Sequence, residues 1–224
     1  MSRLKLSMAT WLIANEAATR EKIAAAKRQG VGLVTGGGPF EIAQDRGLLT
    51  EYLELCAQLG IDRIEAGEGF TVPRATPEEV MRLANHFALT VQVELGEKHG
   101  GAFDDQAVRR LIERGKRWLE AGAVQIVVEG RESAQGVGLF DDQARLNFSA
   151  AEAFVDAWGM QATIFEAPTK RSQFDLLSHF GNEVNLSNVR LEEVLRVEIY
   201  RRGLHADSYA RELAPRPVPA VEHP

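Results

Sequence analysis

The chain has 224 residues and a formal net charge of −6 at pH 7, and 45% of its residues are hydrophobic. This composition is typical of a soluble globular protein large enough for one α/β domain. An acidic balance without a basic run argues against a nucleic-acid-binding protein. There is no signal-like apolar stretch at the N-terminus and no long apolar span elsewhere, so we expect no membrane anchor. Cys56 is the single cysteine, which excludes an internal disulfide and favours a cytoplasmic protein with Cys56 in its core.

Short apolar runs alternate with helical patterns along the sequence. We expect strands at 4–6, 31–34, 61–64, 89–93, 124–128, 160–165 and 184–186. Helices are expected at 15–29, 50–59, 76–87, 104–120, 149–158, 172–180 and 191–202, with a short helical turn at 41–46. Asn15 is a candidate N-cap, and Thr76 can form a capping box with Glu79.

This alternation of strand and helix predicts an α/β protein built as a TIM-type (β/α)8 barrel. Only seven strands are visible, so the first β/α unit is expected to be absent or to lie before Met1. We expect residues 1–209 to form a single barrel domain and the Pro-rich residues 210–224 to be a disordered tail. A seven-stranded barrel leaves an open edge, so we expect a partner chain or the tail to cover it, and the protein to be a homo-oligomer.

Four expected strands end in a glutamate that is followed within two residues by Gly or Pro: Glu65, Glu94, Glu129 and Glu166. The carboxyl ends of parallel strands meet at one edge, where α/β proteins place their sites, so we expect an acidic ring there. The alternative is that some of these carboxylates cap helices or pair with Lys and Arg. The polar stretch 129–147 is expected to be a long functional loop.

The segments 184–189 and 129–133 resemble those of the phosphosulfolactate synthase family, whose members add sulfite to phosphoenolpyruvate in coenzyme M biosynthesis. The similarity continues, in order along the chain, through the motifs at 5–10, 36–41, 65–69, 94–98 and 165–168, and covers Lys5 to about Tyr209. The chain departs from the family in three places, one of which is the first motif, where Ser7 and Ala9 stand in place of the family's glycines. It has no counterpart of the family's first strand with an Asp-Lys-Gly sequence, and His205 stands where the family has an Arg.

The resemblance implies a barrel that uses Mg²⁺ and a lysine that protonates the reaction intermediate, which maps onto Lys98. Sulfite addition puts a second negative charge on the substrate carboxylate, and a divalent cation held by oxygen ligands would stabilise that charge. The candidate ligands are Glu65, Glu94, Glu129 and Glu166. Without the resemblance, Lys98 would be interpreted as an ordinary surface lysine.

The small anionic substrates need cations and hydrogen-bond donors. The candidates are Lys5, Arg131, Lys170, Asn185 and Asn188, the last two at the end of the last strand, where barrels often bind phosphate. Arg131 could instead pair with Glu132, Lys170 could face solvent, and either Asn could cap the last helix. The alternative functions are a non-catalytic or stress-associated member of the family, or a lyase that uses a different nucleophile on an enol phosphate.

Overall fold

The computed structural model describes residues 2–98 and 100–209, so the tail expected at 210–224 lies outside the described residues. Its single sheet has seven parallel strands in sequence order, which confirms the predicted TIM-like α/β fold. The strands are β1 (Arg3–Leu6), β2 (Gly32–Thr35), β3 (Arg63–Gly67), β4 (Thr90–Leu95), β5 (Gln125–Val128), β6 (Thr163–Glu166) and β7 (Asn185–Ser187).

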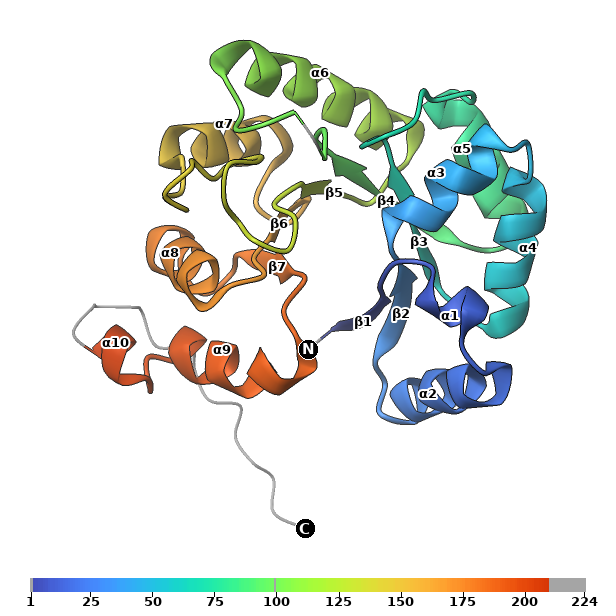
Figure 1. Ribbon diagram of the computed structural model, residues 1–224, viewed down its shortest axis with the longest axis horizontal. Helices are drawn as coiled ribbons and strands as arrows, with labels where there is room; N and C mark the ends of the chain where they lie inside the picture. Colours follow the sequence, from blue (N-terminus) through green and yellow to red (C-terminus); the bar gives the residue numbers. More distant parts are fainter. Residues whose placement is uncertain (1, 99, 210–224) are drawn as a thin grey trace.

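The sheet curls, and the helices cover its outer side (Figure 1). They are α1 (Thr10–Ile13), α2 (Glu16–Arg28), α3 (Gly37–Asp45), α4 (Leu49–Leu59), α5 (Pro77–His86), α6 (Asp105–Ala121), α7 (Phe148–Trp158), α8 (Lys170–Phe180), α9 (Val194–Arg201) and α10 (Ala206–Tyr209). A 3₁₀ turn, η1 (Leu191–Glu193), precedes α9. The short helices α1 and α10 were not expected, because four residues are too few to show a helical period.

Local side-chain chemistry sets several helix starts as expected. Asn15 accepts a hydrogen bond from the amide of Ala18 at 3.1 Å and caps α2. Thr76 and Glu79 form the predicted capping box of α5, with bonds of 2.8 and 3.3 Å. The turn expected at 41–46 is the second half of α3, which begins at Gly37. The first half was not expected, because its glycine and proline residues have a low helix propensity.

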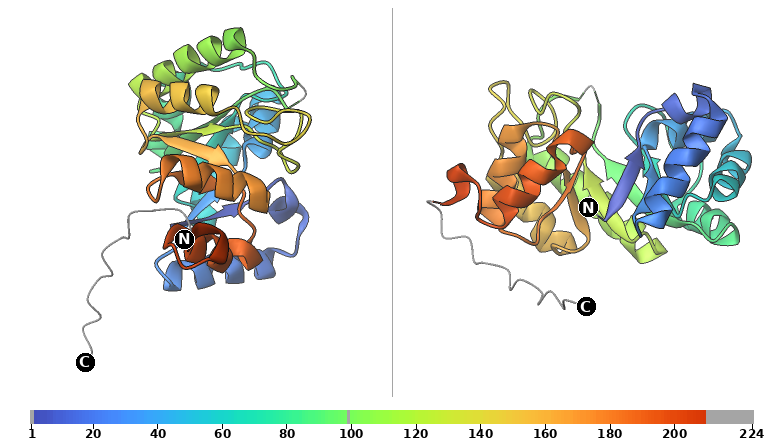
Figure 2. Two further views of the ribbon diagram at one scale, coloured as in Figure 1. Left: turned by 90° about the vertical axis from the view of Figure 1, so that its left-hand side faces the viewer. Right: turned by 90° about the horizontal axis from the view of Figure 1, so that it is seen from below.

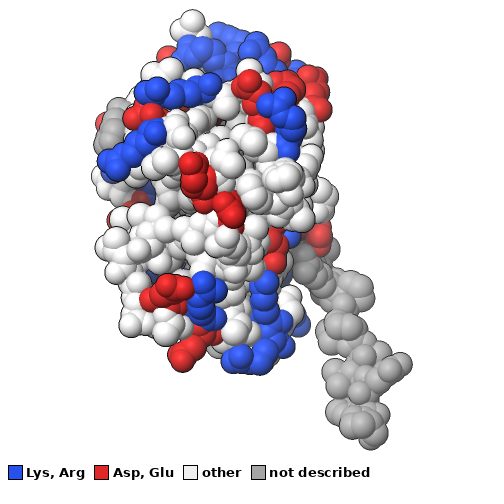
Figure 3. Space-filling model, turned by 90° about the vertical axis from the view of Figure 1, so that its right-hand side faces the viewer, with Lys and Arg blue, Asp and Glu red and all other residues white. Residues whose placement is uncertain are grey.

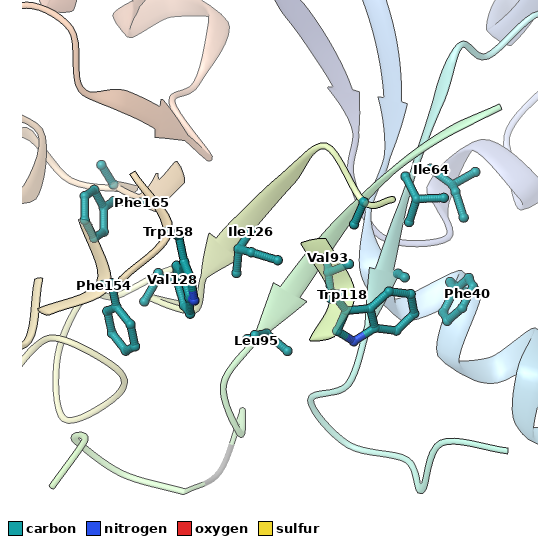
Figure 4. Close-up of a cluster of buried hydrophobic side chains, with 14 of the residues drawn as sticks. Phe40, Ile64, Val93, Leu95, Trp118, Ile126, Val128, Phe154, Trp158 and Phe165 are labelled. Atoms are coloured by element: carbon teal, nitrogen blue, oxygen red, sulfur yellow. The ribbon is translucent and has the colours of Figure 1, made fainter. Parts of the chain in front are cut away.

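The side chains along each strand alternate between two different environments. In β4, Val91, Val93 and Leu95 alternate with Gln92 and Glu94, and all five are buried. Since successive side chains of a strand point to opposite faces, the apolar set packs against the helices while the polar set lies inside the curl. Figure 4 shows the apolar side, where Val93 and Leu95 lie near Trp118 of α6.

The helix layer is closely packed at the contact of α6 with α7. A Cβ at Gly115 would lie 2.5 Å from the ring of Trp158, so this position in α6 requires glycine. The Trp158 indole donates to the carbonyl of Ile112 at 3.1 Å, and its ring stacks on Phe154 at 4.8 Å (Figure 4). This contact holds α7 and α6 together over β5.

The inside of the curl is polar. Arg63 of β3 donates to Gln125 Oε1 of β5 at 2.6 Å and to Gln92 Oε1 of β4 at 3.4 Å, which links three strands near their amino ends. Gln92 Nε2 then donates to Glu65 Oε2 at 2.8 Å, one layer closer to the carboxyl ends. Buried polar groups inside the curl are therefore connected to the acidic residues at the strand ends.

The curl stays open between its first and last strands. In the described part of the chain, β1 pairs with β2 and β7 with β6, but no backbone ladder joins β1 to β7. Helices α9 and α2 lie on either side of the start of β1 (Figures 1 and 2). A closed barrel would have backbone hydrogen bonds across this opening.

The stretch expected as a long loop, 129–147, is folded onto the barrel. Ala134, Val137, Leu139 and Phe140 are buried, and short bridges join Phe140 to Val137 and to Leu146. In the face shown in Figure 3, basic and acidic side chains gather toward the upper and lower ends, and a few acidic side chains stand out in an otherwise uncharged middle. Within residues 2–98 and 100–209, no helix is long and apolar enough to cross a membrane.

Candidate active site

The structure brings Glu65, Glu94, Glu129 and Glu166 to the carboxyl edge of the sheet, where all four are at most 3% exposed. Glu65 and Glu94 lie in the last three residues of β3 and β4, Glu129 directly follows β5, and Glu166 is the last residue of β6. Four buried carboxylates in one place would repel one another unless cations or protons compensate for their charge.

Lys5 of β1 supplies one such cation from the centre of the cluster. Its Nζ lies 2.8 Å from Glu65 Oε1, 3.4 Å from Glu166 Oε1 and 3.9 Å from Glu94 Oε2. It also donates to Asn188 Oδ1, just beyond β7, at 3.1 Å. The Lys5 ammonium is thus surrounded by protein acceptors, where the sequence predicted a contact with substrate.

Backbone amides neutralise part of the remaining charge. The amide of Gly37, at the start of α3, donates to Glu65 Oε1 at 2.9 Å. A Cβ at Gly37 would lie 3.1 Å from Gly67 Cα and 3.3 Å from Glu94 Oε2, so the close approach of this helix to the cluster depends on glycine. The partial positive charge at the N-terminus of α3 stabilises the ionised form of the carboxylates that it faces.

The amides that follow β5 serve Glu166 and Glu129 in the same way. Gly130 and Arg131 donate their N–H groups to Glu166 Oε2 at 3.0 and 3.1 Å. The Arg131 amide also lies 2.7 Å from Glu129 Oε1, and Arg131 has a φ of 53°, in the left-handed region. This turn therefore orients two carboxylates with its backbone.

Lys98 provides a second ammonium at the rim of the cluster. Its Nζ lies 3.1 Å from Glu94 Oε1 and 5.6 Å from the centre of the Phe70 ring. With 28% of its side chain exposed, Lys98 reaches both the buried carboxylates and solvent. A lysine in this position can meet a substrate that enters over the strand ends.

Burial and mutual charge shift the pKa values of the cluster in opposite directions. Burial raises the pKa of Glu65 to about 8, although Lys5 acts against the shift. Burial, together with the charges of Glu166 and Glu94, raises the pKa of Glu129 to about 9. Burial would also raise the pKa of Glu94, but Lys5 and Lys98 outweigh it and lower that pKa to about 2.

The two lysines stay protonated at neutral pH. Burial acts to lower the pKa of Lys5, but the charges of Glu65 and Glu166 outweigh burial and raise it. Burial likewise acts to lower the pKa of Lys98, and Glu94 followed by Glu129 raises it above its ordinary value. Both ammonium groups therefore carry a proton across the physiological range.

Two neighbouring carboxylates are incompletely satisfied. Within the described residues, Glu129 Oε2 and Glu94 Oε1 are buried and accept no hydrogen bond, although Glu94 Oε1 contacts Lys98. Glu94 raises the pKa of Glu129, and Glu129 acts to lower that of Glu94. In the same part of the chain, no set of three His, Cys, Asp or Glu residues is arranged to hold a metal ion.

The predicted substrate-binding residues fall in different places. Arg131 is exposed and donates from Nη1 to the carbonyl of Lys98 at 3.0 Å, so it borders the site. Asn188 lies inside the cluster and donates to Glu166 Oε1. Lys170 pairs with Asp207 at 3.0 Å and does not contact these residues.

Asn185 is also separate from the cluster. Its side chain donates to the carbonyls of Met160 and Thr163 at 3.0 and 3.1 Å, at the amino end of β6. The strand ends that carry the carboxylates lie at the opposite edge of the sheet. The contacts of Asn185 therefore hold β7 against β6, and they leave it away from the strand ends.

Glu41, the last residue of the motif at 36–41, is a further buried carboxylate, which the sequence did not indicate as a site residue. It lies in α3, is 0% exposed, and accepts hydrogen bonds from the loop that follows β3. It follows no apolar strand, so the strand-end pattern could not find it. A glutamate next to Phe40, on the buried side of a glycine-rich helix start, was the available signal.

Comparison with known proteins identifies the family. The model of the (2R)-phospho-3-sulfolactate synthase (ComA) family matches residues 2–207. The chain belongs to this family. The phosphosulfolactate synthase of Methanocaldococcus jannaschii is 29% identical over 209 residues, which cover 93% of this chain and 83% of the relative.

Two further relatives have the same name. The phosphosulfolactate synthase of Methanothermobacter thermautotrophicus is 32% identical over 184 residues, 79% of this chain and 69% of the relative. That of Bacillus subtilis is 27% identical over 191 residues, 84% of this chain and 75% of the relative. The resemblance identified from the sequence motifs is thereby confirmed at the level of the family.

Proposed function

We propose that this protein is a Mg²⁺-dependent lyase that adds sulfite to phosphoenolpyruvate and forms 2-phospho-3-sulfolactate. Membership of the family supports the reaction. The observation that carries the proposal is the position of the Lys98 ammonium, 3.1 Å from Glu94 at the carboxyl edge of the sheet and partly open to solvent. Sites of barrel-type enzymes lie at this edge.

The reaction has two bond-making steps. The sulfur lone pair of sulfite forms a C–S bond to C3, and the C2–C3 π electrons move onto C2 and the carboxylate. A proton then passes from the Lys98 ammonium to C2, and the neutral amine regains a proton from solvent. The raised pKa of Lys98 keeps its side chain in the protonated form. The intermediate formed by sulfite addition carries the extra electron pair on C2 and the carboxylate (an aci-carboxylate), and it is basic enough to take a proton from an acid as weak as Lys98.

The residues present fit a divalent cation. Mg²⁺ is commonly held by one or two carboxylates together with water and substrate oxygens. Glu129 has a buried oxygen with no hydrogen-bond partner in the described chain, and Glu94 is its neighbour. These two residues would hold the ion, which when bound would stabilise the negative charge that develops on the substrate carboxylate.

The other residues of the cluster hold Glu65 in place and border the site. Lys5, Gln92 and the amide of Gly37 hold Glu65 by three contacts of 2.8–2.9 Å. Arg131 stands at the rim, where its guanidinium can meet a phosphate or sulfite oxygen. The cation and Arg131 together would offset the repulsion between an acidic site and its anionic substrates.

Phosphorus NMR of purified protein with phosphoenolpyruvate, sulfite and Mg²⁺ tests the proposal. We expect a new phosphate-ester resonance that grows with time and is absent when sulfite is omitted or EDTA is added. If no ester forms while phosphoenolpyruvate still raises the melting temperature, the nucleophile is not sulfite. If neither turnover nor binding occurs, the protein is a non-catalytic member of the family.

A further inference from the structure

Residues 67–71, the last residue of β3 and the start of the connection to α5, form a loop that touches Lys98 in three ways. The backbone amide of Lys98 donates to the carbonyl of Gly69 at 3.2 Å. The Lys98 ammonium lies over the ring of Phe70. A Cβ at Gly69 would come within 3.0 Å of both Cγ and Cε of Lys98, so the bare glycine leaves space for the lysine stem. The position of this loop therefore sets the path of the Lys98 side chain.

Glu41 of α3 holds this loop from one side. Its Oε2 accepts hydrogen bonds from the amides of Phe70 and Thr71 at 2.8 and 2.9 Å and from the Thr71 hydroxyl at 3.1 Å. Its Oε1 faces Gly67, where a Cβ would come within 2.7 Å. Hydrogen bonds to a buried carboxylate are among the stronger ones in proteins, so Glu41 is a firm anchor.

Glu68 holds the same loop from the other side. Its side chain accepts a hydrogen bond from Trp118 Nε1 of α6 at 3.0 Å and another from Arg114. The loop is therefore fixed to α3 through Glu41 and to α6 through Glu68, next to the residues that contact Lys98. A loop anchored to two helices has little freedom to shift, which suits a support for a reactive group.

We propose that Glu41 is a positioning residue that fixes the Lys98 ammonium through the loop 67–71. Glu41 itself meets no substrate in this scheme, and the inference rests on the proposed role of Lys98 as proton donor. Because Lys98 acts after the substrates have bound, misplacing it should lower kcat and leave KM nearly unchanged.

Three variants separate this role from general damage. Glu41→Ala removes the acceptor of the loop amides, whereas Glu41→Gln keeps a side-chain oxygen that can accept them. Asp45→Ala is the matched control, since Asp45 lies in the same helix but is exposed and pairs with Arg74 at 2.7 Å. We expect Glu41→Ala to lose about tenfold or more in kcat with KM changed less than about twofold, and the other two to stay near wild type.

Amide hydrogen exchange followed by NMR gives a readout that needs no turnover. In Glu41→Ala, the amides of Phe70, Thr71 and Lys98 should all exchange faster, while in Asp45→Ala they should keep their protection. If Glu41→Ala does not fold, Glu41→Asp, which keeps the charge but withdraws the carboxylate by one methylene, should show the same faster exchange.

The inference is overturned if the Lys98 amide keeps its protection while those of Phe70 and Thr71 lose theirs. It is also overturned if KM rises as much as kcat falls, or if Glu41→Gln loses as much kcat as Glu41→Ala. A wild-type protein without turnover would count against the proposed function alone, and the exchange result would still decide whether Glu41 controls Lys98.

Discussion

The Lys5 ammonium donates to Asn188 Oδ1 at 3.1 Å and so joins the first strand of the sheet to the residue that follows the last one. Asn188 in turn donates a hydrogen bond to Glu166, which also accepts one from the Lys5 ammonium at 3.4 Å. Within the described residues, no backbone ladder joins β1 to β7. Side chains of the acidic cluster therefore span the opening that a full barrel would close with backbone hydrogen bonds.

Replacing Lys5 with methionine should strongly destabilise the protein. The substitution leaves Glu94 and Glu166 buried without the Lys5 ammonium, and loss of one partner of a buried ion pair typically costs about 3–5 kcal/mol. Arg3→Met, in the same strand, is the control, because the ion pair of Arg3 with Asp62 is half exposed and 3.8 Å long. Urea unfolding at pH 7 measures both, and equal stabilities of Lys5→Met and wild type would contradict a structural role for Lys5.

The cluster also predicts how stability depends on pH in the absence of divalent cations. The pKa values of Glu65 and Glu129 are raised to about 8 and about 9 on folding. Between the ordinary glutamate pKa and these values the folded state binds more protons than the unfolded state, so stability should fall as pH rises from about 5 to about 9. Glu94, whose pKa is lowered, contributes the opposite slope, and only below about pH 4.5.

Glu129→Gln tests this dependence, because the amide cannot ionise. Thermal melts of this variant should decline less between about pH 6 and 9 than those of wild type. Glu113→Gln, at an exposed position of α6, should follow the wild-type curve. Parallel curves for Glu129→Gln and wild type would show that Glu129 is already ionised in the folded protein at neutral pH.

Mg²⁺ should stabilise the protein more at high pH than at low pH. The ion would take the place of the proton that Glu129 otherwise holds, so the gain in melting temperature should grow as pH rises from about 6.5 to 8.5. EDTA should reverse the gain, and Glu129→Gln should largely abolish it. A full Mg²⁺ response in Glu129→Gln would place the ion elsewhere.

The opening of the barrel leads us to expect a homo-oligomer. Leu191, Leu195 and Ile199 follow one another at helical spacing along η1 and α9 and are 61, 75 and 43% exposed. Light scattering on a sizing column should give a mass above that of one chain, and Leu195→Glu should lower it. A wild-type monomer at micromolar concentration would contradict this expectation.

The fold was predictable because the relevant signals are local. Short apolar runs that alternate with helical patterns located all seven strands, and a glutamate at the end of four of these runs indicated Glu65, Glu94, Glu129 and Glu166. The contacts of Lys5 were not predictable, because they depend on how far the sheet curls, which the strand pattern does not encode. The role of Glu41 was not predictable for a similar reason, since the amides that donate hydrogen bonds to it lie 29 and 30 residues further along the chain, in a loop.

The two candidate asparagines also show that sequence spacing does not predict where a side chain lies in the sheet. Asn185 and Asn188 are three residues apart, and both were assigned to a phosphate site. The register of β7 against β6 places Asn185 at the amino edge of the sheet, and a left-handed turn with φ of 57° brings Asn188 into the cluster. Register and turn conformation separate them, and neither is visible in the spacing.

The most direct test of the central claim compares Lys98→Met with Lys116→Met in the phosphorus NMR assay of sulfite addition. Lys116 is an exposed lysine of α6 that pairs with Glu113 at 3.0 Å, so its loss should leave the rate near wild type. A general acid typically contributes a factor of about 10²–10⁴, and we expect kcat of Lys98→Met to fall by that much with the fold intact. A folded Lys98→Met that forms the phosphate ester at the wild-type rate would contradict the assignment of Lys98 as the proton donor.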